Sequence, residues 1–451
     1  MNPNGRSLYL VAVVGAGPAG LFAAKLLAAE GAHVVLFNRD IKPGGLAEYG
    51  IYHDKYRMKE GLRKQFRHIL ASPDVDYYGN VTVGQSAGLS LDELRALGFQ
   101  AILVTVGAQG TKWLGLPGED LRGVYHAKDI VYHYNHLPPY ATQPFDIGRR
   151  VAVVGVGNVM LDMAHYLIRD RMVDEVIAVA RRGPMEVKFD KAEMELVGRN
   201  LDLDALDREL ARVQPLIQAV GQDVAKARAL IVAGVATALD PVSDTRFRFD
   251  FLASPTRVLG DAHDRVTGLE VEDTHLVAAG EDTKAKGLGT TRVIDCDTVV
   301  FAIGDKVDES FGLPVQWNSF VKSKSPRFPI EGVSYEAFDP QANRPLEGVF
   351  VAGWSREAST GLVGAARKDG MYGAKAVLQY LKTLTPTGTA ALDGLSQRLA
   401  QLDEPVVSKA DWQRLEDVER AEAQKRGLDI FKFDANEDML TAMGIALAQP
   451  S

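Results

Sequence analysis

The sequence predicts an α/β fold with two Rossmann-like dinucleotide-binding domains, each a parallel sheet covered by helices. A short β-branched run leads into a glycine-rich turn and then into a helical segment, and this order occurs twice, from residue 9 and again from residue 151. Alternating strands and helices of this kind form parallel sheets with helices on their faces. We therefore expect two nucleotide sites in one chain.

Composition narrows the possible functions. The 451 residues are 46% hydrophobic and 24% charged, which is typical of a globular protein with two or three domains. A net charge of -8 argues against a general nucleic-acid binder. The single cysteine, Cys296, excludes a disulfide framework, a four-cysteine zinc site and an iron-sulfur cluster held by this chain alone. Redox chemistry would therefore need an organic cofactor.

The sequence carries no signal for a membrane or for secretion. No apolar run reaches the roughly 18 residues of a membrane span. The first eight residues are too short and too polar for a signal peptide. We therefore expect a cytoplasmic protein with neither a membrane nor a nucleic acid as a partner.

The first glycine-rich turn follows the strand YLVAVV and places Gly15, Gly17 and Gly20 in the GxGxxG spacing. The first glycine permits a tight turn, the second lets a pyrophosphate approach the backbone, and the third allows helix and strand to pack closely. Because a helix and a second strand, HVVLF, follow, a glycine-rich loop without a ligand is the weaker interpretation. That strand ends at Asn38, where such folds usually place an acid, and the amide can still bond a ribose hydroxyl.

The second turn contains Gly155 and Gly157, but Met160 stands in place of the third glycine, so its pattern is weaker. The strand that follows its helix, EVIAVA, ends at Arg181 and Arg182. Guanidinium groups at this place favour the 2′-phosphate of NADPH, whereas an NADH site would favour an acid. The alternative is a pair of arginines that are solvated or bonded to carboxylates.

Several blocks together resemble one known family, the adrenodoxin reductase type of ferredoxin-NADP reductase, which has the glutathione-reductase-like fold with two dinucleotide sites. The resemblance covers nearly the whole chain, with the blocks in the order of the family. Members of that family hold FAD in the first unit and NADPH in the second. The blocks that carry the resemblance are GAGPAG, GGLAEYGI, YYGNVTVG, LPGEDLRGV, VGVGNVMLD, ARRGPMEV, VAGW, STGLVG and DWQRLEDVE.

The resemblance implies FAD contacts along the first half of the first unit. Ala19 would lie at the pyrophosphate, between the glycines of the turn, and Asn38 would lie at the ribose. Leu46 would lie beside the flavin and Val83 near the adenine.

A second group of FAD contacts is implied near the end of the chain. Trp354 and the backbone of Gly361, Leu362 and Val363 would lie beneath the flavin ring. Peptide N–H groups of that segment, at the start of a helix, would stabilise negative charge on the reduced ring.

The resemblance also implies the NADPH contacts of the second unit. Arg181 and Arg182 would bind the 2′-phosphate, and Glu193 would hold the carboxamide of the nicotinamide. We predict no catalytic side chain and no metal site, because the cofactors supply the chemistry. The predicted contacts to the pyrophosphate are Val156, Gly157, Asn158 and Val159.

The expected domain organisation is an FAD-binding domain split by an inserted domain. The FAD-binding part would comprise residues 1–107 and 306–451, and the NADPH-binding domain residues 108–305. Asn38, the triplet His53-Asp54-Lys55 and the triplet Glu357-Ala358-Ser359 depart from the family pattern. The two triplets would lie near the outer edge of the flavin and bear on the identity of the electron acceptor.

A basic helix is a candidate surface for a ferredoxin-like acidic electron carrier. In KEGLRKQFRH, residues Lys59, Arg63 and Arg67 are spaced four apart, on a stripe that we expect to face solvent. Met58 and Leu62 would face the core with Phe66 and Ile69. Such a stripe could steer an acidic protein, although a plain solvated face is the other interpretation.

These observations predict a flavoprotein oxidoreductase that passes a hydride from NADPH to FAD and then single electrons to a ferredoxin-type iron-sulfur protein. Two alternatives stay open. The first is an NADPH-dependent flavin reductase of a small organic or quinone acceptor, and the second is an electron-input subunit of a larger redox complex.

Overall fold

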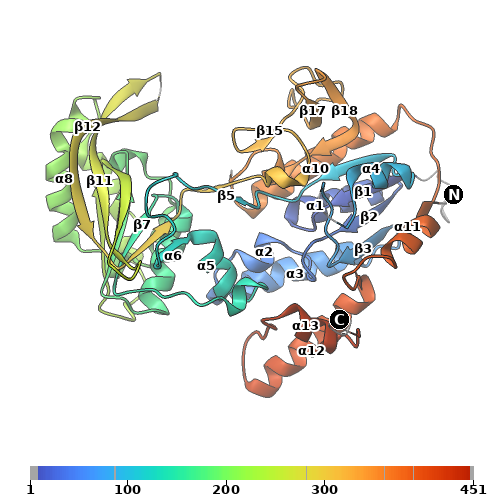
Figure 1. Cartoon of the computed structure of the whole chain (residues 1–451), viewed down its shortest axis with the longest axis horizontal. Coiled ribbons are helices and arrows are strands. Elements are labelled where there is room, and N and C mark those ends of the chain that lie inside the picture. The colour runs from blue at the N-terminus through green and yellow to red at the C-terminus, as the bar shows by residue number, and fades with distance from the viewer. Residues whose placement is uncertain (1–8, 86–87, 281, 360, 390, 447–451) are drawn as a thin grey trace. The chain divides into compact units, whose positions relative to one another are not determined.

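The structure is a computed structural model that describes residues 9–85, 88–280, 282–359, 361–389 and 391–446. The chain divides into two compact units (Figure 1). Unit 1 comprises the chain up to Thr111, Tyr132–Thr142 and the chain from Gly304 onward, and unit 2 comprises Lys112–Val131 and Gln143–Ile303. This division differs from the expected insertion of residues 108–305, because Tyr132–Thr142 lies with unit 1, where Tyr132 and Leu137 pack on Tyr49.

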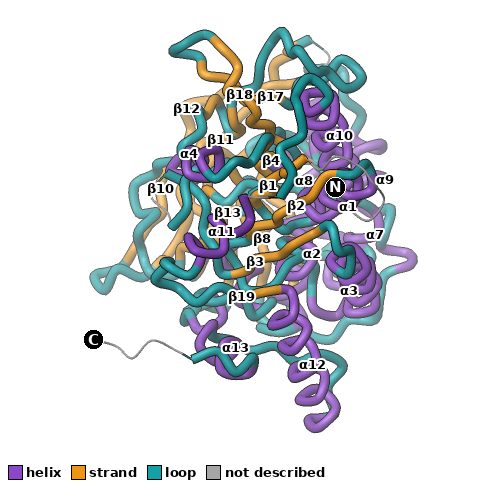
Figure 2. The backbone as a smooth tube through the Cα atoms, turned by 90° about the vertical axis from the view of Figure 1, so that its right-hand side faces the viewer, coloured by secondary structure: helices purple, strands orange, loops and turns teal. Residues whose placement is uncertain are grey.

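Unit 1 contains a seven-stranded sheet in the order β17-β18-β4-β1-β2-β3-β19 (Figure 2). The five central strands are parallel, and the edge strands β17 and β19 are antiparallel to their neighbours. Strands β1, β2 and β4 are almost fully buried, as strands covered on both faces are. Their bounds are β1 (Tyr9–Val14), β2 (Ala32–Phe37), β3 (Val75–Gly79), β4 (Ala101–Val104), β17 (Glu336–Asp339), β18 (Arg344–Val351) and β19 (Val407–Ser408).

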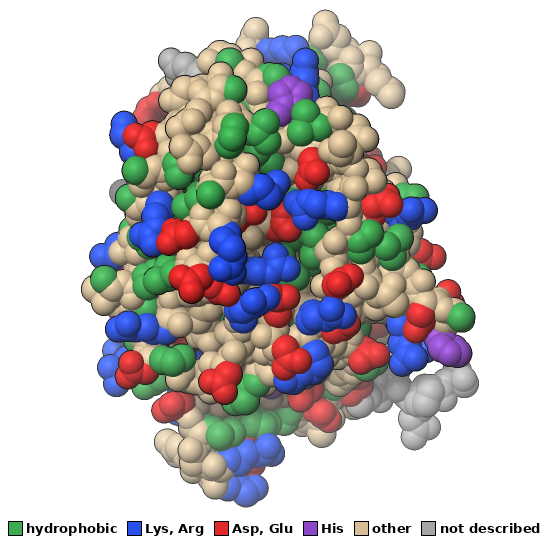
Figure 3. All heavy atoms as spheres, turned by 90° about the vertical axis from the view of Figure 1, so that its left-hand side faces the viewer, with side chains coloured by type: hydrophobic (Ala, Val, Ile, Leu, Met, Phe, Trp, Pro, Cys, Tyr) green, Lys and Arg blue, Asp and Glu red, His purple; other side chains and the backbone are tan. Residues whose placement is uncertain are grey.

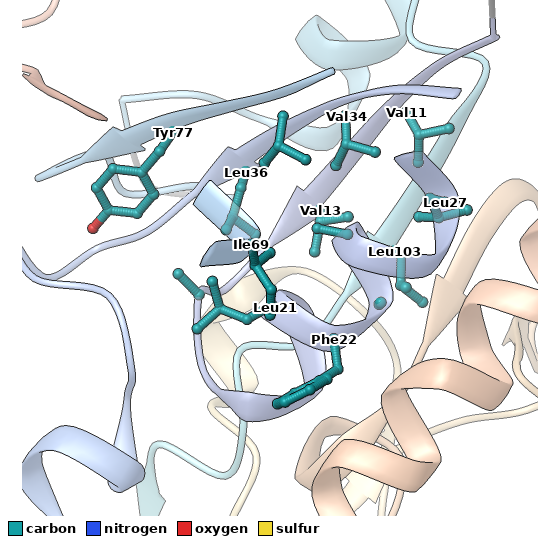
Figure 4. Packing of buried hydrophobic residues seen from close by; sticks show 14 of the residues in the cluster. Val11, Val13, Leu21, Phe22, Leu27, Val34, Leu36, Ile69, Tyr77 and Leu103 are labelled. Carbon is teal, nitrogen blue, oxygen red and sulfur yellow. The ribbon is translucent and has the colours of Figure 1, made fainter. Parts of the chain in front are cut away.

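Helices cover this sheet, and α1 packs most closely against it. Leu21 and Leu27 of α1 lie in one buried cluster with Val13 and Leu36 of the sheet (Figure 4). The helices of unit 1 are α1 (Pro18–Ala29), α2 (Leu46–Tyr49), α3 (Tyr56–Leu70), α4 (Leu91–Ala96), α10 (Val363–Leu381), α11 (Ala391–Leu399), α12 (Lys409–Arg426) and α13 (Asn436–Ala442). Two small antiparallel pairs join β5 (Gly110–Thr111) with β14 (Asp305–Lys306) and β15 (Val315–Gln316) with β16 (Ser319–Phe320).

Unit 2 contains a second parallel sheet, in the order β6-β13-β7-β8-β9. A separate antiparallel sheet of three strands, β10-β11-β12, follows it along the chain. The bounds of the strands are β6 (Val124–His126), β7 (Arg150–Val154), β8 (Glu175–Ala180), β9 (Arg246–Phe251), β10 (Ala253–Gly260), β11 (Val266–Ala279), β12 (Asp282–Asp295) and β13 (Thr298–Phe301). The helices are α6 (Asn158–Arg169), α7 (Lys191–Met194), α8 (Leu203–Gln218) and α9 (Val224–Val232). Helix α5 (Ala127–Tyr134) begins in unit 2 and ends in the Tyr132–Thr142 segment of unit 1.

Two parallel sheets, each entered through a glycine-rich turn and a helix, confirm the predicted fold class. Among the described residues, no helix is both long enough and apolar enough to cross a membrane.

The structure confirms the predicted core face of α3 at Phe66 and Ile69, which are buried, and at Leu62, which packs against the core, but it contradicts the prediction for Met58 and Lys59. Lys59 is only 2% exposed, whereas Met58, predicted to face the core, is 58% exposed. Arg63 binds the buried carboxylate of Glu48, and the partly exposed Arg67 binds Glu416 and Glu60, so the stripe that we expected in solvent is paired with carboxylates of unit 1. The prediction was wrong because long basic side chains can be buried when partners distant in the sequence neutralise them.

Candidate functional site

The glycine-rich turn of unit 1 is close-packed at two glycines and open at the third. Gly15 has φ +105°, and a Cβ there would lie 2.5 Å from the carbonyl oxygen of Thr105. A Cβ on Gly20 would lie 1.9 Å from the carbonyl oxygen of Gly15. A Cβ on Gly17 would meet nothing within 4 Å. Gly17 therefore leaves space beside the backbone, as a bound pyrophosphate requires.

The turn of unit 2 repeats this arrangement at its first two glycines. Gly155 has φ +134°, and a Cβ there would lie 2.4 Å from the carbonyl oxygen of Ala302. A Cβ on Gly157 would meet nothing within 4 Å. Met160, at the third position, is fully buried in the core. The second turn therefore keeps the tight bend and the open approach without the third glycine.

Two distant segments come together at the first turn. A Cβ on Gly45 would lie 3.1 Å from the Cα of Gly17, so Leu46, the first residue of α2, follows directly beside the turn. A Cβ on Gly353 would lie 2.8 Å from the Cβ of Ala19, which brings the segment of Trp354 to the same place. The structure thus gathers Gly17, Ala19, Leu46 and Trp354, as the predicted FAD contacts require.

Asn38 joins the end of β2 to the first turn. Its Oδ1 accepts a hydrogen bond from the backbone N–H of Ala16 at 3.0 Å, and its Nδ2 donates to the carbonyl oxygens of Asp40 and Lys42 at 2.8 and 3.0 Å. The residue is 7% exposed. Both of its amide donors are thus engaged within the protein, which leaves one Oδ1 lone pair for the predicted bond to a ribose hydroxyl.

The predicted flavin-ring segment forms the start of α10. Gly361 has φ +74°, Leu362 caps the helix and is 65% exposed, and Val363 is the first helical residue. Leu362 makes no side-chain cap bond, so N–H groups of the first turn stay available at this helix start. Val83 lies in the buried cluster below the ends of the strands, so a contact of this residue to an adenine would have to use its backbone.

Sequence reasoning missed Asp369, which fixes the segment of Trp354 to α10. Its carboxylate accepts hydrogen bonds from the backbone N–H of Gly353 at 2.6 Å, from the hydroxyl of Tyr335 at 3.0 Å and from the guanidinium of Arg356 at 2.7 Å. Arg356 precedes the divergent triplet, in which Glu357 binds Arg356. Arg356 and Asp369 are 13 residues apart, and the segment between them includes a loop and the first part of α10. No short sequence motif could therefore have indicated that they form an ion pair.

A buried ion cluster lies beneath the Gly44-Gly45 bend. Glu48 binds Arg63 through two hydrogen bonds of 2.6 and 2.7 Å and binds Lys432 at 2.9 Å. Burial by itself would raise the pKa of Glu48, but Lys432, Arg63 and Lys42 hold it well below its ordinary value. Lys59, which donates to Asn135, has no such carboxylate contact, and burial lowers its pKa to about 6.

In unit 2, the chain after β8 runs beside the second turn. Asn158 and Asp190 exchange two hydrogen bonds of 2.9 and 2.8 Å, and the backbone N–H of Lys188 donates to the carbonyl oxygen of Val156 at 2.8 Å. Glu193 lies three residues beyond Asp190, on α7, which packs against α6. The structure thus brings Glu193 to the helix that begins at Asn158. Val159 is a half-exposed residue of the same first turn.

The two arginines that end β8 have different surroundings. Arg182 binds the carboxylate of Asp282 at 3.0 Å and the carbonyl oxygen of Thr283 at 3.2 Å, both at the start of β12. Within the described ranges, the exposed guanidinium of Arg181 forms no hydrogen bond or ion pair. Of the two arginines, only Arg182 is bonded to a carboxylate, as one alternative interpretation proposed for the pair. The guanidinium of Arg181 is available to a ligand.

Comparisons with known proteins agree with this geometry. Residues 9–201 match the family model described as pyridine nucleotide-disulphide oxidoreductase. The mitochondrial NADPH:adrenodoxin oxidoreductase of Arabidopsis thaliana is 27% identical over 96% of this chain and 95% of its own length. The human protein of that name is 29% identical over 96% and 92%. The predicted family resemblance is confirmed.

A solved structure gives the same result for the fold. The structure titled "Mycobacterium tuberculosis FprA in complex with NADPH" superposes with a TM-score of 0.79 at 26% sequence identity. The superposition covers 96% of this chain and 99% of that one. The chain thus shares its fold with this relative over nearly the full length of both chains.

Proposed function

We propose that this chain is an FAD-dependent NADPH:ferredoxin oxidoreductase, in which NADPH gives a hydride to FAD and single electrons pass to a ferredoxin-type iron-sulfur protein. The observation that carries the proposal is the pair of glycine-rich turns, each with an open approach at its second glycine. Similarity over nearly the full length to NADPH:adrenodoxin oxidoreductases supports the pairing of the two sites in one enzyme.

The residues around the first turn fit FAD. Gly17 and Gly45 lie side by side at the place where a dinucleotide has to approach the backbone, and a Cβ on either would occupy that space. Leu46 and Trp354 are brought beside that turn, and the start of α10 offers backbone N–H groups to a developing negative charge. FAD bound there would supply the conversion of a two-electron hydride into single electrons.

The residues of unit 2 do the work of binding and orientation. The backbone at Gly157 would hold the pyrophosphate of NADPH, and Arg181 with Arg182 would hold its 2′-phosphate. Glu193 would accept a hydrogen bond from the nicotinamide carboxamide and so fix which atom of the ring faces the flavin. No protein acid or base is needed in this scheme. The cytoplasmic location remains a prediction from the sequence.

The test is anaerobic reduction followed by a choice of acceptors. The purified protein should be yellow, should bleach with one equivalent of NADPH, and should then reduce a ferredoxin. Reoxidation by quinones but by no ferredoxin would favour the flavin reductase alternative. A colourless protein that takes up no FAD would refute the proposal.

The preference for NADPH has its own test. Changing Arg181 and Arg182 together to alanine should raise the KM for NADPH about 100-fold or more, since each of the two lost charge-assisted hydrogen bonds contributes roughly 1.5–3 kcal/mol. The KM for NADH should stay within about twofold. Arg199, an exposed arginine of unit 2, provides the control substitution Arg199→Ala, which should change neither constant. Equal effects on the two coenzymes would refute the role of the two arginines.

A further inference from the structure

A groove of about 300 Å³ lies on unit 1 among α1, α3 and α10. Figure 2 shows α1 between the other two helices, in agreement with their contacts. Phe22 and Ile69 provide its apolar surface. Its charged side chains are all basic, namely Lys25 from α1, Lys64 from α3 and Arg367 from α10, and His68 of α3 also lines the groove. We call this feature the basic groove.

The cations of the basic groove lack internal counterions. In the part of the chain that the structure describes, Lys25, Lys64, His68 and Arg367 form no ion pair, and no carboxylate lines the groove. Arg367 lies over the ring of Phe22, with its guanidinium carbon 4.2 Å from the ring centroid. The cationic charge of the groove is therefore available to a partner, although the chain as a whole has a net charge of -8.

Several other basic residues of the described chain are paired with carboxylates. In unit 2, Arg228 binds Asp207 at 2.6 Å and Arg212 binds Glu209 at 2.7 Å. On the face shown in Figure 3, basic and acidic side chains are interspersed. On α3 itself, Arg63 and Arg67 bind carboxylates, while Lys64 points into the groove.

We propose that the basic groove is the docking surface for the acidic iron-sulfur carrier protein, an inference that rests on the proposed function. Positive charges around an apolar centre match the polar rim and apolar core of a protein interface. A small phosphate is a poorer fit, since the groove is open and offers one guanidinium rather than a converging set of donors. A local basic patch also overcomes the repulsion between an acidic carrier and a chain of net negative charge.

The position of the groove suits electron transfer. Phe22 lies three residues beyond Ala19 in α1, and Arg367 lies four residues beyond Val363 in α10. At a rise of about 1.5 Å per residue, these separations correspond to about 4.5 and 6 Å along the helix axes. Ala19 and Val363 are predicted FAD contacts, and the two helices pack so closely that a Cβ on Gly370 would lie 2.1 Å from the carbonyl oxygen of Ala19. A carrier bound in the groove would thus dock beside the elements that hold the flavin.

The experiment compares charge reversals inside and outside the groove. Lys64→Glu and Arg367→Glu are made in the full-length flavin-loaded protein, with Lys382→Glu as the matched control. Lys382 follows the last turn of α10, about 22 Å from Arg367 along the helix axis. An acidic [2Fe–2S] ferredoxin is the probe, measured both by direct binding and by NADPH-dependent reduction at several salt concentrations. Reduction of ferricyanide by NADPH reports on flavin chemistry without docking.

We expect each groove variant to raise the KM for ferredoxin about tenfold and to flatten its dependence on salt, with the ferricyanide rate unchanged. The Lys382 variant should stay within about twofold. If the KM for ferredoxin of the groove variants changes no more than that of the Lys382 variant, the basic groove is not the docking surface. A wild-type protein that reduces ferricyanide but neither binds nor reduces the ferredoxin would overturn the proposed function together with its docking surface. Arg367 also lies over the ring of Phe22, so the Arg367→Glu variant could lose its flavin for a structural reason. In that case the result with Lys64→Glu decides whether the groove binds the carrier.

Discussion

The two glycine-rich turns share their first two glycines and differ at the third. In both, a Cβ on the first glycine would lie 2.4–2.5 Å from a carbonyl oxygen of a neighbouring strand, and a Cβ on the second would meet open space. At the third position of the first turn, the carbonyl oxygen of Gly15 lies so close to Gly20 that no Cβ fits there. At the same position of the second turn, the side chain of Met160 is buried in the core. The difference teaches that the first two glycines serve the bend and the ligand, and that the third serves only the packing of helix on strand.

The surroundings of the two turns differ as well. The first is backed by buried ions, with Glu48 and Lys42 in the interior beside the Gly44-Gly45 bend. The second is braced by the hydrogen bonds between Asn158 and Asp190, which are exposed to solvent. We therefore expect changes at the packed positions behind the first turn, such as Gly20 and Glu48, to affect folding and flavin together, and changes around the second turn to affect the coenzyme alone.

The largest effect should come from Gly20→Ala. The added methyl group would lie 1.9 Å from a backbone oxygen, so α1 has to shift away from β1. We expect a loss of stability of roughly 3 kcal/mol or more and a protein that no longer retains FAD. Thermal unfolding and the flavin absorbance per chain measure both effects. If the variant unfolds at the same temperature as the wild type, Gly20 is not needed for the packing of α1 against β1.

The next effect concerns the ion cluster. Glu48→Gln would leave Lys432, Arg63 and Lys42 without their shared carboxylate, which should lower the free energy of unfolding by about 3–5 kcal/mol at pH 7. Because the pKa of Glu48 is depressed in the folded state, its stabilisation is complete above the ordinary value of 4.5 and is lost as the pH falls toward the depressed pKa.

The difference between wild type and Glu48→Gln should therefore shrink in urea titrations below about pH 4.5. Glu60→Gln is the matched control, because Glu60 is a half-exposed carboxylate that binds Arg67 on the surface of the same helix. Its effect should stay below about 1 kcal/mol. A Glu48 variant as stable as the Glu60 variant at pH 7 would contradict the role of the cluster.

A pair of substitutions at the open positions separates the two sites. Gly17→Ala should abolish FAD retention, and Gly157→Ala should weaken NADPH by about tenfold or more while FAD stays bound. Neither added methyl group meets a protein atom within 4 Å, so the apoprotein of each variant should unfold at the wild-type temperature. Loss of both ligands from either variant would refute the separate assignment of the turns.

The smallest effect should come from Asp282→Asn. The carboxylate of Asp282 is 3.0 Å from Arg182 and would compete with a 2′-phosphate for this guanidinium. Because the side chain of Asp282 is 73% exposed, we expect only a two- to fivefold tighter Kd for 2′,5′-ADP and no change for AMP. Titration calorimetry at two salt concentrations measures both constants. Weaker binding of 2′,5′-ADP would show that Asp282 positions Arg182 rather than competing for it.

The sequence alone predicted both turns, because strand, glycine spacing and helix are local patterns with a direct steric meaning. Gly15, Gly17 and Gly155 lie where that spacing placed them. The sequence also placed Arg181 and Arg182 at the end of a strand, and β8 ends at Ala180.

Only the tertiary structure decided which basic side chains of α3 are buried and which cations are free. The predicted core face at Leu62, Phe66 and Ile69 was right, but Lys59 was placed on the solvent side and is buried. Its inward position depends on Asn135, and that of Arg63 on Glu48, which in turn binds Lys432, 384 residues away. The burial of a charge depends on counterions that folding brings from distant segments, and no local pattern records them.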